Sequence, residues 1–289
     1  MSEAQRLRID QLAAAVDRCL AAAEIPHALI KGATTSSWLY PPSRFYFDVD
    51  MLVPTSRVPD AIRALAADGI AYGEMAGAAT EAGHSVELRT PTRYEVDLHS
   101  SLPSLPPVGD ALWGAIAPHV VAYDLGVGVV DALDEVGRCL VLAFHALSGG
   151  ERLDQRTEDL RRAVAAAPAS TWTQARAIAA TIGADDLFDA ALTRVGGTTP
   201  PGGFSVRAAL LLDDAPPEAM ALDRFLRAPR RDWPAMILRE FWPTSAFMRT
   251  AYPRAVERRG GILRARLARW GLIIARLPAA LRAYRGARP

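Results

Sequence analysis

The stretch HALIKGATTSSWLYPPSRFYFDVDMLV, residues 27–53, decides how the rest of the chain is interpreted. It opens with a short apolar run that closes at Lys-Gly, which predicts a strand followed by a glycine turn. Residues 33–40 have the length of a short helix, and the two prolines that follow would end it. Residues 45–53 are rich in aromatic and β-branched side chains, which favours a second strand.

The second strand carries two aspartates, Asp48 and Asp50, which leave the same face because strand side chains alternate. Residues 84–90 and 93–99 also alternate, and they predict a hairpin whose second strand places Asp97 on its polar face. Neighbouring carboxylates repel each other unless a cation lies between them, and carboxylate oxygens are the ligands that Mg²⁺ prefers. The sequence therefore predicts a metal site at Asp48 and Asp50, with Asp97 on the polar face of another strand.

These motifs resemble a known family. A glycine, a short helix and then Asp-x-Asp on a strand are the signature of the polymerase-β-like nucleotidyltransferases. More narrowly, LIKG…R…FDVDMLV and the later Val-Asp-Leu-His of residues 96–99 resemble the bacterial uncharacterised nucleotidyltransferases, which often occur in peptide natural-product gene clusters. The resemblance covers roughly the first half of the chain well. It is looser in the second half, where His145 followed by Asp159 and Leu160 fits the family's pattern.

The resemblance implies an α/β fold, with an N-terminal polymerase-β-like nucleotidyltransferase domain (a mixed sheet flanked by helices) followed by an α-helical domain. It implies an enzyme that transfers an NMP from an NTP such as ATP to a hydroxyl of a small-molecule or peptide acceptor, with release of pyrophosphate. An RNA end or a protein side chain as acceptor stays open, as does transfer of a phosphoryl or glycosyl-phosphate group.

The same resemblance implies roles for single residues. Two Mg²⁺ ions would be held by Asp48, Asp50 and Asp97, and Asp97 could also take the proton of the acceptor hydroxyl. His99 would lie on the acceptor side. The residues expected to bind the nucleotide are Lys31, Gly32, Thr34 and Arg44.

One position departs from the superfamily pattern, because Ala33 stands where a serine is usual. Thr34, Thr35 or Lys31 would have to replace the serine hydroxyl, and Lys31 is the only lysine among 33 basic residues. The departure supports an alternative function, a catalytically lapsed fold that acts as a substrate- or partner-binding module in a biosynthetic pathway. The intact acid triad argues against this alternative, because unused like charges on one face cost stability without a metal.

The pattern after residue 131 is helical, so we predict a catalytic domain at 1–131, a helical bundle at 132–248 and a basic helical segment at 249–289. In the apolar helix expected at 133–147, His145 fits a core residue or a catalytic one. Residues 249–289 hold eleven arginines and one acid, whereas the whole chain has a net charge of +1, so the rest of the chain is acidic.

Four interpretations of the basic segment stay open: a solvated helix, binding of an anionic partner, an amphipathic helix on a membrane, and packing of its apolar face on the acidic body. Pro278 is expected to interrupt its helix.

The composition predicts a substantial core, because half of the 289 residues are hydrophobic. Cys19 and Cys139 lie far apart in the sequence and fit buried thiols rather than a disulfide, which predicts a reducing, cytoplasmic location. The first residues have no apolar signal-peptide core, and residues 270–277, an apolar run broken by Arg276, are too short to cross a bilayer.

Overall fold

The structure, a computed structural model, describes residues 3–39, 46–73, 84–92, 94–149, 152–252 and 261–288. These residues form two compact units, one that ends at Thr198 and one that begins at Thr199. We predicted domain divisions at residues 131 and 248, and these remain a proposal about functional regions. The compact units divide elsewhere, because helices after residue 131 pack in the same unit as the sheet.

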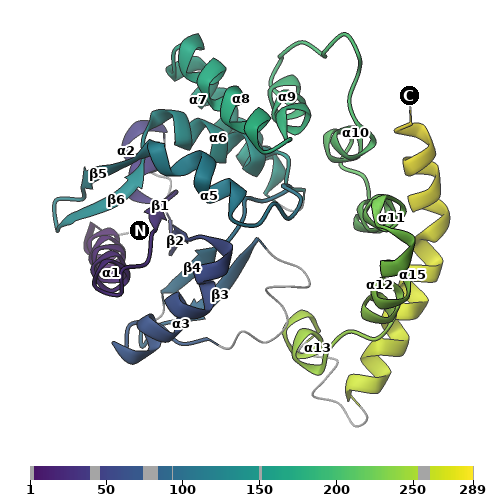
Figure 1. Ribbon diagram of the computed structural model, residues 1–289, viewed down its shortest axis with the longest axis horizontal. Coiled ribbons are helices and arrows are strands. Elements are labelled where there is room, and N and C mark those ends of the chain that lie inside the picture. The colour runs from purple at the N-terminus through teal and green to yellow at the C-terminus, as the bar shows by residue number, and fades with distance from the viewer. Residues whose placement is uncertain are drawn as a thin grey trace. The chain divides into compact units, whose positions relative to one another are not determined.

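The first unit is built on one six-stranded sheet with the strand order β3-β4-β2-β1-β6-β5 (Figure 1). The central strand β2 runs parallel to β4 and antiparallel to β1, and β1 runs parallel to β6. The outer strands β3 and β5 pair antiparallel with β4 and β6. The strands span Ala28–Leu29 (β1), Asp48–Leu52 (β2), Ser85–Arg89 (β3), Glu95–His99 (β4), Val120–Asp124 (β5) and Val129–Leu133 (β6).

One face of this sheet is the core. Val49 and Met51 of β2 and Val96 and Leu98 of β4 are at most 1% exposed, and they belong to an apolar cluster that includes residues of α1 and α3. Because strand side chains alternate, the aspartates of β2 and β4 must leave the opposite face. The helices before and between the strands span Glu3–Ala22 (α1), Ala33–Leu39 (α2), Val58–Ala67 (α3, preceded by a 3₁₀ turn at Thr55–Arg57) and Ala111–Ile116 (α5, followed by a 3₁₀ turn at Ala117–His119).

Four helices complete the first unit: α6 (Glu135–Ala146), α7 (Leu153–Ala166), α8 (Ala169–Thr181) and α9 (Asp185–Arg194). The helix α6 is the central one, since α7, α8 and α9 each contact it and it also contacts β6. Asp134 caps its N-terminus by accepting a hydrogen bond from the backbone of Gly137 at 2.9 Å. The buried side chains of α6 include Leu140 and Phe144, both fully buried.

The second unit is helical. Its elements are α10 (Val206–Leu212), α11 (Pro217–Arg227), a 3₁₀ turn at Arg230–Asp232, α12 (Trp233–Phe241), α13 (Ser245–Ala251) and the long α15 (Gly261–Gly286). The interruption expected at Pro278 does not occur, since α15 continues through it. The missing N–H of Pro278 leaves the carbonyl of Ile274 without its helical partner, and Ile274 is 64% exposed, so this carbonyl is open to water.

The predicted fold class, a mixed sheet flanked by helices and followed by a helical region, is confirmed. Among the residues that the structure describes, no helix is long and apolar enough to cross a membrane.

Candidate functional site

Two of the three predicted aspartates lie side by side. Asp50 and Asp97 are register partners on the parallel strands β2 and β4, so their side chains leave the same face. His99 follows two positions later on β4, and ligand atoms of Asp50, Asp97 and His99 all lie within 4.8 Å of one another. Asp48 lies on the same face two positions before Asp50.

Asp50 is the most enclosed member of the group, with 5% of its surface exposed. Its Oδ1 accepts hydrogen bonds from Nζ of Lys31 at 3.1 Å and from Nε2 of His99 at 2.8 Å. Burial raises the pKa of Asp50, but the ammonium of Lys31 and the contact with His99 outweigh it and hold this pKa well below its usual range. Asp50 is therefore ionised at neutral pH.

The other two aspartates are not neutralised in this way. Burial, followed by the charges of Asp50 and Asp48, raises the pKa of Asp97 to about 6. Burial and the charge of Asp50 also raise the pKa of Asp48. Three carboxylates crowded on one half-buried face have more negative charge than Lys31 neutralises, and this donor set fits a divalent cation. Magnesium prefers oxygen ligands, so the aspartates are the fitting ligands, and His99 is the partner of Asp50.

The predicted nucleotide-binding residues fall into different environments. Gly32 has a φ of +70°, which explains why a glycine stands between β1 and α2. Thr34 is fully buried, and its hydroxyl donates to the carbonyl of Lys31 at 3.2 Å, so it holds the turn that carries the lysine. Thr35 is also buried. Arg44 lies outside the described residues.

Lys31 is held close to β2 by the backbone as well as by its side chain. The amide of Ile30 donates to the carbonyl of Asp50 at 3.0 Å, which fixes the chain one residue before the lysine. The carbonyl of Thr34, in the following helix, accepts from Arg138 of α6 at 2.8 Å, and this guanidinium lies 5.1 Å from the ring centroid of Trp38.

Two histidines that we did not assign to the site lie around it. The ring of His84 lies 5.4 Å from that of His99, because the β3–β4 hairpin brings residue 84 beside the end of β4. Burial, and then the charges of His99 and Lys31, lower the pKa of His84 to about 4. The periodicity of residues 84–90 could have indicated this position, because a hairpin register pairs the start of one strand with the end of the other.

His145, near the end of α6, is the second of these histidines. Burial, and then the charges of Lys31 and Arg156, hold its pKa well below the usual range, while Asp50 and His99 also act on it. Its imidazole is therefore neutral and close to the charged groups of the site. The sequence left open whether His145 is a core or a catalytic residue, and only the packing of α6 brings it to this side of the sheet.

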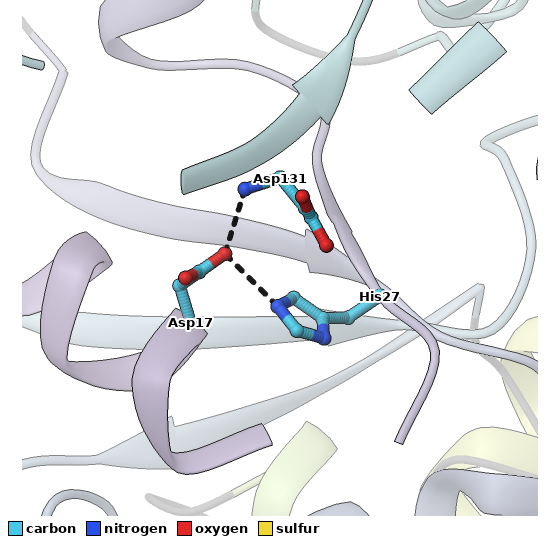
Figure 2. A group of neighbouring side chains, drawn as sticks. All are labelled: Asp17, His27 and Asp131. Carbon is cyan, nitrogen blue, oxygen red and sulfur yellow. Dashed lines mark hydrogen bonds and ion pairs between the residues drawn. The ribbon is translucent and has the colours of Figure 1, made fainter. Parts of the chain in front are cut away.

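A second acidic cluster, Asp17, His27 and Asp131, has metal-like spacing but a different chemistry (Figure 2). Nε2 of His27 lies 2.9 Å from Oδ1 of Asp17, and Nδ1 lies 2.7 Å from the carbonyl of Ile25, so both ring nitrogens face acceptors. Asp17 also accepts from the backbone amide of Asp131 at 2.7 Å. A doubly protonated imidazole satisfies all these contacts and has no lone pair for a metal.

The same contacts explain the charge of His27. Burial lowers its pKa, but the hydrogen bonds to Asp17 and Ile25 and the charges of Asp17 and Asp131 outweigh burial, and the net pKa lies above the usual value. We interpret this cluster as a buried ion pair that joins α1 to the segment before β1 and to β6.

The chain is similar to a known protein family and to solved structures. Residues 1–196 match the family described as "Uncharacterised nucleotidyltransferase". Among solved structures, an antigenic nucleotidyltransferase-like protein from Paracoccidioides brasiliensis aligns at 14% identity with a TM-score of 0.36, over 64% of this chain and 94% of that one. No protein with a curated function matches the sequence. Since the family match covers more than half of the chain, the protein belongs to the uncharacterised nucleotidyltransferase family and is a transferase.

Proposed function

We propose that the protein is a Mg²⁺-dependent nucleotidyltransferase, which transfers an NMP from an NTP to a hydroxyl group and releases pyrophosphate. The observation that carries this proposal is the placement of Asp50 beside Asp97 on parallel strands, with Asp48 on the same face. Asp48, Asp50 and Asp97 would hold two Mg²⁺ ions. When bound, these ions would activate the attacking oxygen and neutralise the charge of the triphosphate.

The protein's own groups would mainly position the reactants. We propose that Lys31, now 3.1 Å from Asp50, exchanges this partner for the triphosphate, which its flexible four-carbon stem allows. Gly32 would let the turn follow the phosphates closely, and Arg44 would be a further phosphate ligand. Thr34 would act indirectly, since its hydroxyl holds the carbonyl of Lys31.

His99 contacts the site through the carboxylate of Asp50. We predicted it on the acceptor side, yet it is 1% exposed and its Nε2 is directed at Asp50. We therefore propose that His99 orients the Asp50 carboxylate. His84 and His145, which are neutral, would then form the acceptor side together with Asp97, which would receive the proton of the attacking hydroxyl.

The nature of the substrates is the finer part of the proposal. We propose ATP as the first nucleotide to test, and a small molecule or peptide as the acceptor, in line with the natural-product context that the family resemblance implies. The free, buried thiols of Cys19 and Cys139 and the need for an NTP both support a cytoplasmic reaction. We also propose that residues 1–131 supply the metal and phosphate ligands and that α6, which carries His145, shapes the acceptor side.

The test is pyrophosphate release from each labelled NTP in the presence of Mg²⁺ and a lysate of the producing organism, followed by isolation of the labelled product. Asp50→Asn should abolish labelling, whereas Glu24→Gln, which removes an exposed acid outside the sheet, should leave it intact. Labelling that survives Asp50→Asn or the addition of EDTA would overturn the proposal.

One observation favours the lapsed-enzyme alternative. Oδ1 of Asp50 is already engaged by Lys31 and His99, and such a self-neutralised acid needs no metal. Calorimetry with Mg²⁺ and ATP separates the two functions. Metal-dependent binding that Asp50→Asn removes would support the enzyme, and metal-independent binding of a ligand or the absence of nucleotide binding would favour a binding module.

A further inference from the structure

Helix α15 carries an apolar stripe, most of which is exposed. The stripe repeats at spacings of four and three residues, and five of its six side chains are exposed, from 36% to 64%. Its members are Leu263, Leu267, Trp270, Ile274, Leu277 and Leu281. With a rise of about 1.5 Å per residue, the stripe is roughly 27 Å long. A periodic apolar face of this length that is left in solvent is typical of a docking surface.

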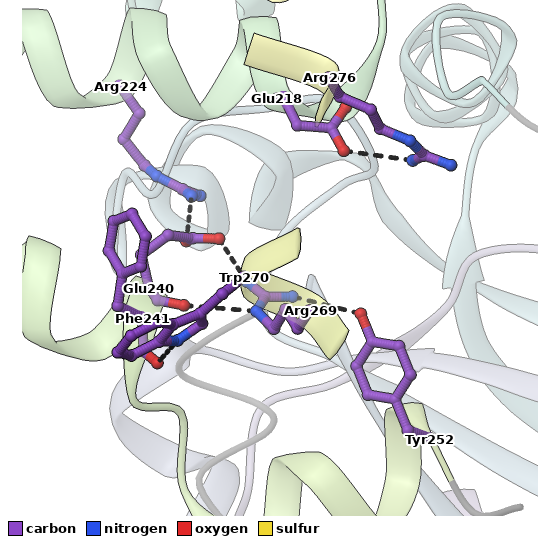
Figure 3. A network of polar contacts seen from close by, with 8 residues as sticks. All are labelled: Glu218, Arg224, Glu240, Phe241, Tyr252, Arg269, Trp270 and Arg276. Atoms are coloured by element: carbon purple, nitrogen blue, oxygen red, sulfur yellow. Dashed lines mark hydrogen bonds and ion pairs between the residues drawn. The ribbon is translucent and has the colours of Figure 1, made fainter. Parts of the chain in front are cut away.

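The opposite side of α15 already holds the helix in its unit. Ala265, Ala280 and Tyr284 are buried, and α10, α11, α12 and α13 all contact α15. Polar contacts add to this packing, as Figure 3 shows: Arg269 pairs with Glu240, and Arg276 donates to Glu218 at 3.2 Å. Of the stripe, only Trp270 takes part, through its indole N–H and the carbonyl of Phe241. The other five stripe residues are therefore not needed to place the helix.

The charge of α15 is one-sided. From residue 261 onward the sequence has seven arginines and no acidic residue. Arg266, Arg269 and Arg276 are engaged by the carbonyl of Pro243, by Glu240 and by Glu218. Arg264, Arg282 and Arg285 are exposed, and within the described part of the chain their side chains have neither a hydrogen bond nor an ion pair. At roughly 100° per residue, Arg264 and Arg282 lie on one border of the stripe, and Arg285 lies one turn beyond Leu281.

We propose that this surface lies on an anionic lipid bilayer, with the stripe in the headgroup region and the three exposed arginines on lipid phosphates. A leucine-rich face bordered by arginines is the usual composition of an interfacial helix. If a second copy of the chain covered the stripe instead, the arginines of the two copies would face each other across the contact and repel. Gly271 and Pro278 lie directly beside the stripe, and neither has a long side chain that could insert between the side chains of a partner helix. A fluid bilayer needs no such interlocking side chains.

The test is sedimentation of the full-length protein with vesicles of equal parts phosphatidylglycerol and phosphatidylcholine, compared with phosphatidylcholine alone. We expect binding to the anionic vesicles that weakens with salt, and binding to the neutral vesicles that is weaker by about a hundredfold, since each exposed arginine contributes about fivefold. The variant Arg264→Gln/Arg282→Gln/Arg285→Gln should lose a similar factor.

Leu267→Glu/Ile274→Glu removes two exposed leucine-type side chains from the stripe and should lower binding by at least about a hundredfold. Leu272→Glu is the matched control: Leu272 is also exposed, at 47%, but lies on the other side of the same helix, so it should bind as the wild type does. Circular dichroism shows whether each variant keeps its helices.

Three results would overturn the proposal: no binding to anionic vesicles at low salt, equal loss with Leu272→Glu and Leu267→Glu/Ile274→Glu, or a dimer in light scattering that only Leu267→Glu/Ile274→Glu disrupts. The last result would assign the stripe to a second copy. Vesicle binding is independent of the proposed transferase reaction, so either proposal can fail without the other.

Discussion

Replacing Asp97 with asparagine should stabilise the metal-free protein while removing its proposed activity. The carboxylate of Asp97 is half-buried beside Asp50 and Asp48, and its pKa is raised to about 6. A free aspartate titrates near 3.9, so ionisation of Asp97 at neutral pH costs the folded state roughly 3 kcal/mol. Asparagine has the same shape and no charge, so Asp97→Asn recovers up to this amount.

The pH dependence gives this prediction its sign. Because the folded pKa is raised, the folded protein binds the Asp97 proton more tightly than the unfolded chain does, and stability falls as the pH rises from about 4 to about 6. The advantage of Asp97→Asn should therefore be full at pH 7 and nearly absent below about pH 4. For a unit of this size, 3 kcal/mol corresponds to a rise in Tm of roughly 6–12 °C.

The assay is urea unfolding in EDTA at pH 7 and at pH 4, followed by circular dichroism. Glu24→Gln removes an exposed acid outside the sheet and should change the free energy of unfolding by less than about 0.5 kcal/mol. Added Mg²⁺ should stabilise the wild type more than Asp97→Asn, because only the wild type has three carboxylates for it. An Asp97→Asn variant that is less stable than the wild type at pH 7 would refute the crowding of these carboxylates.

Three further predictions concern other parts of the first unit. Lys31→Arg should lower kcat/KM for pyrophosphate release at least about tenfold, because a rigid guanidinium fork cannot replace the flexible ammonium beside Asp50; unchanged kinetics would remove Lys31 from the mechanism. Gly32→Ala should lower the free energy of unfolding in urea by about 1–2 kcal/mol, because alanine is strained at the φ of +70°. A steric clash does not contribute, since the added Cβ would lie 3.5 Å from the ring of Tyr46, an ordinary contact. The raised pKa of His27, next to Asp17 and Asp131, predicts stability that is full below about pH 6.5 and lost as the pH rises through the folded value. The difference in unfolding free energy between the wild type and His27→Gln should therefore shrink above that pH, and a constant difference would contradict a charged His27.

Much of the fold followed from local patterns in the sequence. Alternation along residues 94–99 separated the buried Val96 and Leu98 from the face of Asp97, and this separation is what the structure has. The same alternation placed Asp48 and Asp50 on one face. Such predictions succeed because side-chain direction in a strand depends on neighbouring residues alone.

The site depended on contacts that no local pattern contains. The polar face of the sheet is enclosed, so that Asp50 is 5% and His99 is 1% exposed, and this enclosure directs Lys31 and His99 at a single oxygen. His145 joins the site from α6, nearly a hundred residues further along the chain.

The sequence by itself determined which residue types are present, the face of each strand on which they lie, and the apolar repeat and the arginines of the C-terminal helix. Only the tertiary structure decided which of these groups are buried together. In the folded protein Arg269 pairs with Glu240 and Arg276 pairs with Glu218, whereas five of the six stripe side chains of α15 are exposed. The physical reason is that the electrostatic energy of a group depends on its burial and on charges distant in sequence, and both are fixed only when the elements pack.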